Sequence, residues 1–338
     1  MTDAPPSPHA RGVRLMGTGM ALPARRLANA DLEKMVDTSD EWITQRTGIK
    51  NRYVVENGSG EGVVDLGSRA LTQALQRAQL DPTQLDVLIC ATMTPDMICP
   101  AAACQIVDRV GATPCGAMDL SAACSGFVSA LNIAASFIRG GVYQHVAIIG
   151  AEVLSSITNW EDRGTCILFG DGAGAAVLGA SDDPDQGSLY QTMNSDGGRW
   201  NELYCPRNED HLPETGAAFT GKYDTLQMNG REIYKFAVST MQGMIRTAME
   251  ACDLAPNDIR AVIPHQSNAR IIESARDKLG FSEEQMILNI DRYGNTSSAS
   301  VGLCLNELME QDALSPGDII LFVALGGGLT WASNVWRL

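Results

Sequence analysis

Blocks of apolar residues alternate along the chain with amphipathic stretches, a pattern that predicts buried strands separated by helices. Three apolar runs, at 145–152, 173–180 and 318–325, have the length and glycine boundaries of strands buried on both faces. Helical patterns that end at glycine cover 124–141 and 268–280. Alternation of this kind is typical of a layered α/β fold.

Two segments resemble each other at a constant spacing. Residues 74–89 and 248–263 align without a gap at 248 − 74 = 174, which places Pro82 over Pro256. Each segment predicts the end of an amphipathic helix, a turn with proline and a short buried strand. We therefore expect a duplicated α/β unit with a site at the junction of its halves.

The expected halves are 12–185 and 186–338, after a disordered tail at 1–11. A polar stretch rich in Gly, Pro and Asn, residues 194–228, is inserted in the second half. Because a loop this long in a compact domain is usually functional, we interpret it as a cover or entrance for the site.

Composition restricts the compartment and the partners. The 338 residues are 45% apolar, enough for a large core, and the nine cysteines include no CxxC pair, which favours reduced thiols over disulfides or a metal site. A net charge of 25 − 40 = −15 argues against nucleic acid, so an anionic ligand needs a local basic patch. The polar N-terminus and the lack of an apolar run of ~18 residues predict a cytoplasmic protein without a membrane span.

One cysteine has a distinctive setting. Cys124, in DLSAACSGF, lies between a strand-like segment and a helical one, and the helix N-terminus is expected to lower its thiol pKa. The small neighbours Ala122, Ala123, Ser125 and Gly126 would let another group approach the sulfur. The local sequence leaves two interpretations open, a nucleophile and an inert buried cysteine.

Three further positions are candidate hydrogen-bond donors. Among four histidines, only His265 lies between a buried strand and a helix start, where a neutral imidazole is expected; a structural histidine is the alternative. Asn295 is either a turn residue or an amide donor to an oxygen that gains negative charge. The glycines at 326–328 form either a tight turn or an oxyanion hole. The glycine-rich segment 169–179 misses the GxGxxG spacing, which argues against a nucleotide loop.

Taken together, these stretches resemble the thiolase-superfamily condensing enzymes, most closely the 3-oxoacyl-(acyl carrier protein) synthase III family. The resemblance runs from about Gly12 to Leu338, through GTGMALP, TSDEWITQRTGI, DLSAACSGF, DRGT, FGDGAGAAVL, PHQSNARI, GNTSSAS and GGGLTW in the order of the family. It implies a five-layered αβαβα fold built from two duplicated halves, and a homodimer.

The resemblance also implies a reaction. Cys124 would take an acyl group from an acyl-CoA primer, while His265 and Asn295 would hold the thioester carbonyl of malonyl-acyl carrier protein as it loses carbon dioxide. The resulting carbanion would attack the acyl-cysteine, with the N–H groups of Cys124 and Gly327 as oxyanion hole. This is the decarboxylative Claisen condensation that initiates fatty acid synthesis; it uses acyl-CoA as a substrate and no permanently bound cofactor.

Two residues indicate the subclass. Leu325 stands where non-decarboxylative thiolases carry a second cysteine, and Asn295 stands where elongating ketosynthases carry a second histidine. The alternatives are a relative in secondary metabolism with another acceptor and, from a different class, a non-catalytic partner subunit that resembles a chain-length factor. The presence of Cys124 and His265 together with Asn295 disfavours the partner subunit.

For coenzyme A, the resemblance implies that Trp42 stacks on the adenine with Arg163 on the opposite face of the base, that Arg46 lies near the phosphates, and that Asn268 lines the pantetheine channel. The alternative for Trp42 is a packing residue in a helix opened by a capping box over 38–41.

For the acidic carrier protein, the candidate contacts are basic residues of the second half: Lys235, Arg270, Arg276 and Lys278. Glu273 and Asp277 interrupt this set, so a solvated mixed-charge helix face is the alternative.

The primer pocket would include Leu325 and, from across the dimer, Cys99. Members that use short primers carry a bulky aromatic residue at the position of Cys99. The smaller side chain predicts that longer or branched primers are accepted.

Overall fold

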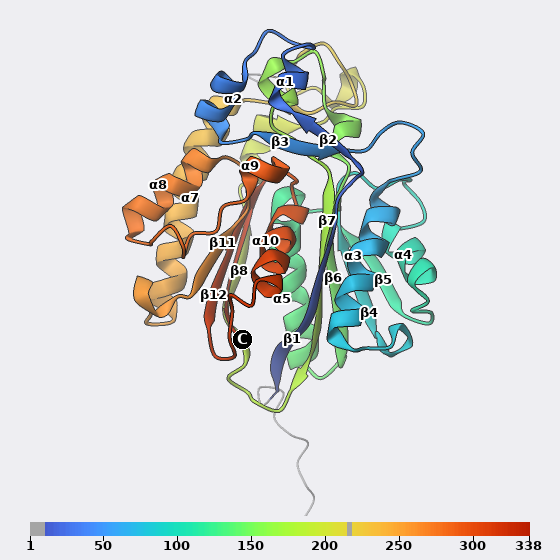
Figure 1. The fold of residues 1–338 in the computed structure, drawn as a ribbon, viewed down its shortest axis with the longest axis vertical. Helices are drawn as coiled ribbons and strands as arrows, with labels where there is room; N and C mark the ends of the chain where they lie inside the picture. Colours follow the sequence, from blue (N-terminus) through green and yellow to red (C-terminus); the bar gives the residue numbers. More distant parts are fainter. Residues whose placement is uncertain (1–10, 215–217) are drawn as a thin grey trace, which may run out of the picture.

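Two β-sheets alternate with three layers of helices in the order α-β-α-β-α (Figure 1). The structure is a computed structural model and describes residues 11–214 and 218–338. Except for Arg11, the predicted N-terminal tail lies outside the described residues. The five-layered architecture expected from the sequence is confirmed.

The first sheet has the strand order β1-β7-β6-β4-β5 and the second has the order β11-β12-β13-β8. The strands of the first sheet are β1 (Gly12–Ala21), β4 (Val87–Ala91), β5 (Gly116–Leu120), β6 (His145–Glu152) and β7 (Gly172–Ser181). Those of the second are β8 (Gly187–Ser195), β11 (Ala261–Pro264), β12 (Ile319–Gly326) and β13 (Thr330–Arg337). Two short pairs lie apart from these sheets: β2 (Arg25–Ala28) with β3 (Asn51–Val54), and β9 (Leu203–Tyr204) with β10 (Gln227–Met228).

Each helical layer shares a hydrophobic core with the sheet or sheets beside it. The outer layers are α3 (Val63–Ala78) with α4 (Ala102–Val110), and α7 (Gly230–Ala251) with α8 (Ala269–Leu279); the middle layer is α5 (Gly126–Arg139) with α10 (Ala299–Glu310). The remaining short helices are α1 (Asn29–Leu32), α2 (Asp40–Thr47), α6 (Arg163–Cys166) and α9 (Ile290–Tyr293). In the described ranges, no helix combines the length and the apolar character needed to cross a bilayer.

The elements predicted from the apolar runs are present. β6, β7 and β12 match the three runs, and both predicted helices form. The N-terminus of α2 differs from the prediction: Ser39, and not Thr38, is the N-cap, and its hydroxyl accepts from the N–H of Trp42. Ser39 has the extended backbone that an N-cap needs, which shifts the cap by one residue.

The two similar segments fold alike. Each passes from a helix through a left-handed residue, Gln79 (φ 52°) or Asp253 (φ 53°), and these positions are again 174 apart. Each continues through a one-turn 3₁₀ helix that starts at proline and then enters a strand, β4 or β11. The duplication of the halves stays a prediction, and these matched elements support it.

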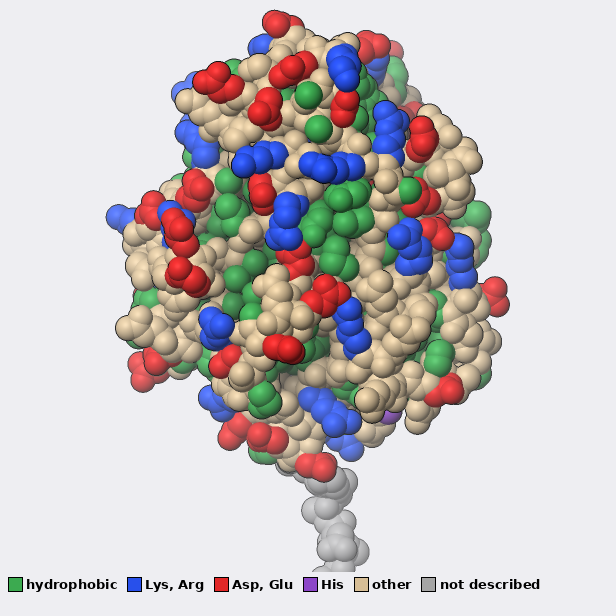
Figure 2. Space-filling model, viewed as in Figure 1, with side chains coloured by type: hydrophobic (Ala, Val, Ile, Leu, Met, Phe, Trp, Pro, Cys, Tyr) green, Lys and Arg blue, Asp and Glu red, His purple; other side chains and the backbone are tan. Residues whose placement is uncertain are grey.

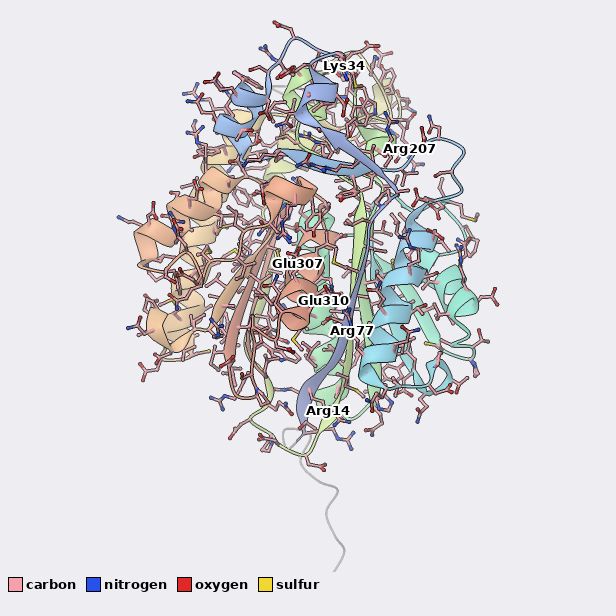
Figure 3. The ribbon with its side chains drawn as sticks, in the orientation of Figure 1. Arg14, Lys34, Arg77, Arg207, Glu307 and Glu310 are labelled. Atoms are coloured by element: carbon pink, nitrogen blue, oxygen red, sulfur yellow. The ribbon has the colours of Figure 1, made fainter. Side chains whose placement is uncertain are left out.

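The middle helix α10 is seated closely on the first sheet. Gly174 of β7 and Gly302 of α10 meet backbone to backbone, because a Cβ built on Gly174 would lie 2.7 Å from the Gly302 Cα. Arg77 of α3 also reaches across to α10, where it hydrogen-bonds Asn306 and forms an ion pair with Glu310 (Figure 3). These contacts fix the segment before α10, which carries Asn295.

We expect Gly174→Ala to lower the free energy of unfolding by about 1–3 kcal/mol, because the added methyl overpacks a backbone contact. The control is Gly243→Ala in α7, where a Cβ meets nothing within 4 Å. That substitution should raise the free energy of unfolding by ~0.5–1 kcal/mol through helix propensity. Chemical denaturation of both variants measures the difference, and equal effects would contradict the close packing of α10.

Candidate active site

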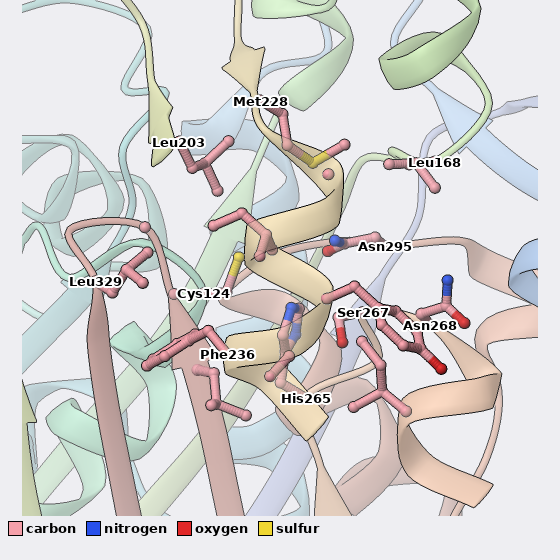
Figure 4. Close-up of a pocket in the computed structure, with 18 of the residues that line it drawn as sticks. Cys124, Leu168, Leu203, Met228, Phe236, His265, Ser267, Asn268, Asn295 and Leu329 are labelled. Carbon is pink, nitrogen blue, oxygen red and sulfur yellow. The ribbon is translucent and has the colours of Figure 1, made fainter. Parts of the chain in front are cut away.

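A cavity of about 120 Å³ lies beside the N-terminal ends of the middle helices α5 and α10, and it gathers side chains from both halves of the chain (Figure 4). Cys124 comes from the first half, whereas His265, Asn295 and the glycines after β12 come from the second. Other residues in its wall include Phe169, Leu203, Met228, Phe236, Asn268 and Leu325. Figure 4 shows the Cys124 sulfur, the His265 ring and the Asn295 amide facing one another.

Cys124 occupies a strained turn between β5 and α5. It lies in a one-turn 3₁₀ helix, Ala123–Ser125, and Ala123 before it has a left-handed φ of 46°. Burial raises the pKa of its thiol to about 12, so the expectation of a lowered pKa is wrong. The helix begins at Gly126, but the loss of water around the buried sulfur outweighs any help from the helix N-terminus.

His265 follows β11 and is fixed at its backbone and at its ring. Its N–H donates to the carbonyl of Val323 (2.8 Å), and Nδ1 lies 2.8 Å from the hydroxyl of Ser300. Burial lowers the pKa of the imidazole to about 3. The ring is therefore neutral, as expected, although burial is the cause.

Asn295 is oriented by the backbone beside it. Its Oδ1 accepts from the N–H of Ser297 (2.9 Å), which turns Nδ2 toward the cavity as a donor. Two further bonds, Asn295 N–H to Leu168 O (2.9 Å) and Gly170 N–H to Asn295 O (3.0 Å), tie it to the first half. The glycine-rich segment 169–179 thus supports Asn295 and continues into β7.

The glycine turn after β12 packs directly on the nucleophile. A Cβ on Gly326 would lie 2.8 Å from the Cys124 backbone nitrogen, so a side chain there would displace Cys124. Thr330 closes the turn, and its hydroxyl lies 2.9 Å from that of Ser125. The turn and Cys124 thus form one rigid unit, and Gly327 lies in the cavity wall beside it.

Glu152 is a buried acid that the sequence reasoning missed. It ends β6, is 0% exposed, and accepts from Ser297 and Thr94 among other donors. Burial raises the pKa of this carboxyl to about 7. Its position at the end of an otherwise apolar strand is the sequence feature that could have identified it.

A second cavity, of about 360 Å³, also borders Cys124. Its wall includes Met93, Ala123, Ile157, Phe169 and Leu226. Leu203 lines both cavities and Met228 lines the first, so the segment predicted as a cover contributes to their walls. Cys99 is exposed and outside both walls in the single chain, whereas Leu325 lines the first.

Of the residues predicted for coenzyme A, Asn268 lines the cavity, and the other three lie together outside its wall. The guanidinium carbons of Arg46 and Arg163 lie 4.8 and 4.9 Å from the centroid of the Trp42 ring. Because Arg163 stacks on Trp42 itself, a base can enter between them only if Arg163 moves. Asn268 caps α8 through the N–H of Arg270, and its amide donates to Arg46 O.

The residues predicted for the carrier protein are partly paired with acids. Lys235 forms an ion pair with Glu232, and Arg276 with Asp277 and Glu283. Arg270 packs over the ring of Tyr234, and it and Lys278 border one shallow depression. Figure 2 likewise shows basic and acidic side chains interspersed over the face in view.

Within the part of the chain that the structure describes, no group of three or more His, Cys, Asp or Glu side chains could hold a metal ion.

His265 should make folding stability depend on pH. The unfolded histidine takes up a proton near pH 6.5, but the folded one remains neutral down to about pH 3. Its stabilising contribution is therefore complete above pH 6.5 and is lost as the pH falls toward 3. When the pH is lowered from 7.5 to 4.5, the free energy of unfolding of His265→Gln should rise by about 2.7 kcal/mol relative to that of wild type. Urea unfolding at both pH values measures this, and a constant difference would contradict a neutral buried ring.

Two family models match the chain. The model described as 3-oxoacyl-(acyl-carrier-protein) synthase III matches residues 118–197, and the model of the C-terminal part of that enzyme matches 249–338. These ranges include Cys124 in the first case and His265 and Asn295 in the second.

Relatives that align over nearly the whole chain belong to the same family as these models. The beta-ketoacyl-(acyl-carrier-protein) synthase III of Caldanaerobacter subterraneus subsp. tengcongensis is 46% identical over 95% of this chain and 96% of its own. The crystal structure of 3-oxoacyl-(acyl-carrier-protein) synthase III from Aquifex aeolicus superposes with a TM-score of 0.89 at 42% identity, over 97% of this chain and 100% of that one. The priming beta-ketosynthase of a polyketide biosynthetic pathway has the same TM-score, 0.89, at 34% identity, over 99% and 98%. The chain therefore belongs to the beta-ketoacyl-(acyl-carrier-protein) synthase III family and is a condensing acyltransferase.

Proposed function

We propose that this enzyme joins an acyl-CoA primer to malonyl-acyl carrier protein with loss of carbon dioxide, and so initiates fatty acid synthesis. The observation that carries the proposal is one buried cavity in which Cys124 from the first half faces His265 and Asn295 from the second. This set combines a nucleophile with two neutral hydrogen-bond donors.

In the first half-reaction, the Cys124 sulfur attacks the thioester carbonyl of the acyl-CoA and coenzyme A leaves. The carbonyl oxygen gains negative charge in the tetrahedral adduct. The N–H groups of Cys124 and Gly327 stabilise that charge. The close contact of Gly326 with the Cys124 nitrogen supports this assignment, because it packs the two segments that carry these N–H groups directly against each other.

In the second half-reaction, His265 and Asn295 hold the malonyl thioester oxygen. Decarboxylation leaves an enolate, which needs neutral donors, because a strong acid would protonate the carbanion. The orientation of Asn295 Nδ2 supplies one donor. The other would be Nε2–H of His265. This requires the Ser300 hydroxyl to turn from the carbonyl of Ser297, to which it donates at 2.9 Å, and to donate to His265 Nδ1, 2.8 Å away.

Two cavities at one sulfur suit a ping-pong order. The acyl chain bound to Cys124 would extend into the larger cavity, lined by Met93, Ile157 and Leu226, while the smaller one receives the malonyl thioester. Leu325 lines the smaller cavity, so on this assignment it would contact the malonyl thioester and not the primer, unlike the expectation from the resemblance. Side chains and backbone N–H groups of the chain perform each step of the two half-reactions. The proposed enzyme therefore uses acyl-CoA as a substrate and has no permanently bound cofactor.

For substrate recognition, we assign the adenine of coenzyme A to Trp42, with Arg163 moving to the opposite face of the base and Arg46 near the phosphates. Asn268, on the cavity wall, would line the pantetheine path. Lys235, Arg270, Arg276 and Lys278 stay the candidate contacts for the acidic carrier protein. Arg270 and Lys278, which border the same depression, are the best placed of the four.

We also propose a homodimer that forms along β5, the edge strand of the first sheet. Met97, Ile98 and Met118 are exposed at and near this edge, and an exposed strand edge with apolar side chains favours pairing with a second chain. Cys99 would then approach the primer cavity of the partner. The nine free cysteines support a reducing cytoplasmic compartment.

We expect radioactive acyl-CoA to leave one acyl group per chain on wild type and none on Cys124→Ala. Cys252→Ala is the matched control, because Cys252 is a free, half-buried cysteine outside the walls of both cavities and its loss should leave labelling intact. His265→Ala should still be acylated but lose malonyl decarboxylation by about 10²-fold or more. The proposed function fails if wild type is not labelled by any primer, and the role of His265 fails if decarboxylation is unchanged.

The small side chain of Cys99 predicts that primers longer or more branched than acetyl are accepted. A panel of acetyl-, butyryl-, isobutyryl- and hexanoyl-CoA, assayed with malonyl-acyl carrier protein and analysed by product mass, measures the preference. At least one larger primer should reach a kcat/KM within about tenfold of acetyl-CoA. A preference for acetyl-CoA by tenfold or more over all others would refute this prediction.

A further inference from the structure

A buried carboxylate lies behind the nucleophile and takes no part in the chemistry described so far. Glu152 at the end of β6 accepts hydrogen bonds on both oxygens. Oε2 accepts from Met93 N–H (3.2 Å) and from the Thr94 hydroxyl (2.8 Å). Oε1 accepts from the hydroxyls of Ser297 and Ser298, each at 3.0 Å.

Ser297 connects this carboxylate to the nucleophile. Its hydroxyl donates to Glu152 Oε1 (3.0 Å), and the same hydroxyl lies close enough to the Cys124 sulfur to act to lower the pKa of that thiol. Ser297 is fully buried and has a left-handed φ of 51°, close to the 46° of Ala123 beside Cys124. Non-glycine residues in this conformation are strained by ~1–3 kcal/mol and cluster at functional sites. The strained backbone on both sides therefore holds one hydroxyl between a thiol and a carboxylate.

The network suits both protonation states of Glu152. When the carboxylate is ionised, the Ser298 hydroxyl can donate to it. When it is protonated, Ser298 can turn to its other acceptor, the carbonyl of Ala91 at 2.9 Å, and its oxygen then accepts from the carboxyl. Gain or loss of one proton therefore leaves no buried hydroxyl without a partner.

We propose that Glu152, acting through the Ser297 hydroxyl, holds the Cys124 proton while the acyl group is transferred. This inference rests on the proposed role of Cys124 as nucleophile. The Cys124 proton passes to Ser297 Oγ as the Ser297 hydroxyl proton passes to Glu152 Oε1, and the freed sulfur electron pair forms the new C–S bond. When the tetrahedral adduct collapses, the C–S bond to coenzyme A breaks, and the leaving thiolate takes a proton back along the same path. Because Glu152 acts through Ser297, it is a positioning residue.

The surrounding groups favour Glu152 as the acceptor. The pKa of its carboxyl, raised by burial to about 7, lies well above that of the His265 imidazole, which burial lowers to about 3. The titratable groups that face Glu152 are Cys124 and Cys90 of β4. Burial keeps the pKa of Cys90 well above its usual range, so Cys90 stays protonated.

Single-turnover acylation by radiolabelled acyl-CoA, without malonyl-acyl carrier protein and between pH 5 and 9, tests the proposal. In wild type the rate should rise with pH as Glu152 ionises near pH 7 and level off above it. Glu152→Gln should slow acylation at pH 8 by about 10²-fold and remove the inflection near pH 7. The glutamine amide fits the site, because its oxygen can accept from Met93 and Thr94 while its NH₂ donates to Ser297 and Ser298.

Two further variants separate a proton path from a structural effect. Ser297→Ala should reproduce the phenotype of Glu152→Gln, and the double variant should be no slower than either, because both changes break one path. Asp171→Asn neutralises another buried carboxylate, which accepts from Ser155 and Val55 and whose pKa burial raises to about 6. It should keep the inflection near pH 7.

If Glu152 acted only through its negative charge, its removal would change the acylation rate in the opposite direction. The negative charge of Glu152 raises the pKa of Cys124, so its removal alone would speed acylation. The proposal is overturned if Glu152→Gln is acylated as fast as wild type or faster. It is also overturned if Glu152→Gln keeps the inflection near pH 7 while Asp171→Asn loses it. Failure of wild type to form any acyl-enzyme would instead refute the proposed function of Cys124.

Discussion

Polar groups buried between the two sheets must find their partners in the opposite half of the chain, and the site depends on this constraint. Glu152 of the first half is satisfied in part by Ser297 and Ser298 of the second. In return, Asn295 of the second half bonds Leu168 and Gly170 of the first. A buried polar group without a partner costs ~1–3 kcal/mol, so sliding one half past the other would break several such bonds at once. Cys124, His265 and Asn295 are held in register as a result.

The same burial determines the chemical state of each group. It keeps His265 neutral, and therefore fit to hydrogen-bond an enolate oxygen without protonating the carbanion. It also keeps Cys124 protonated at rest, which protects the thiol but leaves a proton to be removed during acyl transfer. The burial that keeps His265 neutral for the condensation thus also keeps the Cys124 thiol protonated, which slows the acylation. Glu152 lies nearby and can accept the Cys124 proton during acylation, while His265 stays neutral for the condensation.

Sequence reasoning captured the parts of this arrangement that local pattern encodes. The buried strands β6, β7 and β12 and the turn that carries Cys124 were predictable, because apolar periodicity and glycine boundaries specify them. The fold and family followed from ordered motifs along the whole chain. The protonation of Cys124 was predicted wrongly, because a helix N-terminus is visible in sequence whereas the loss of water around one sulfur is not. Glu152 was missed because its partners Thr94 and Ser297 are 58 and 145 positions away in the chain.

The proposed reaction depends on two assignments: Cys124 is the acylated residue, and the glycine turn of the other half binds the developing oxyanion. A crystal structure of wild-type enzyme soaked with an acyl-CoA, without malonyl-acyl carrier protein, tests both most directly. We expect acyl density continuous with the Cys124 sulfur, with its carbonyl oxygen within hydrogen-bond distance, about 3 Å, of the Cys124 and Gly327 nitrogens. Acyl density on another cysteine, or a carbonyl oxygen turned away from both nitrogens, would contradict these assignments.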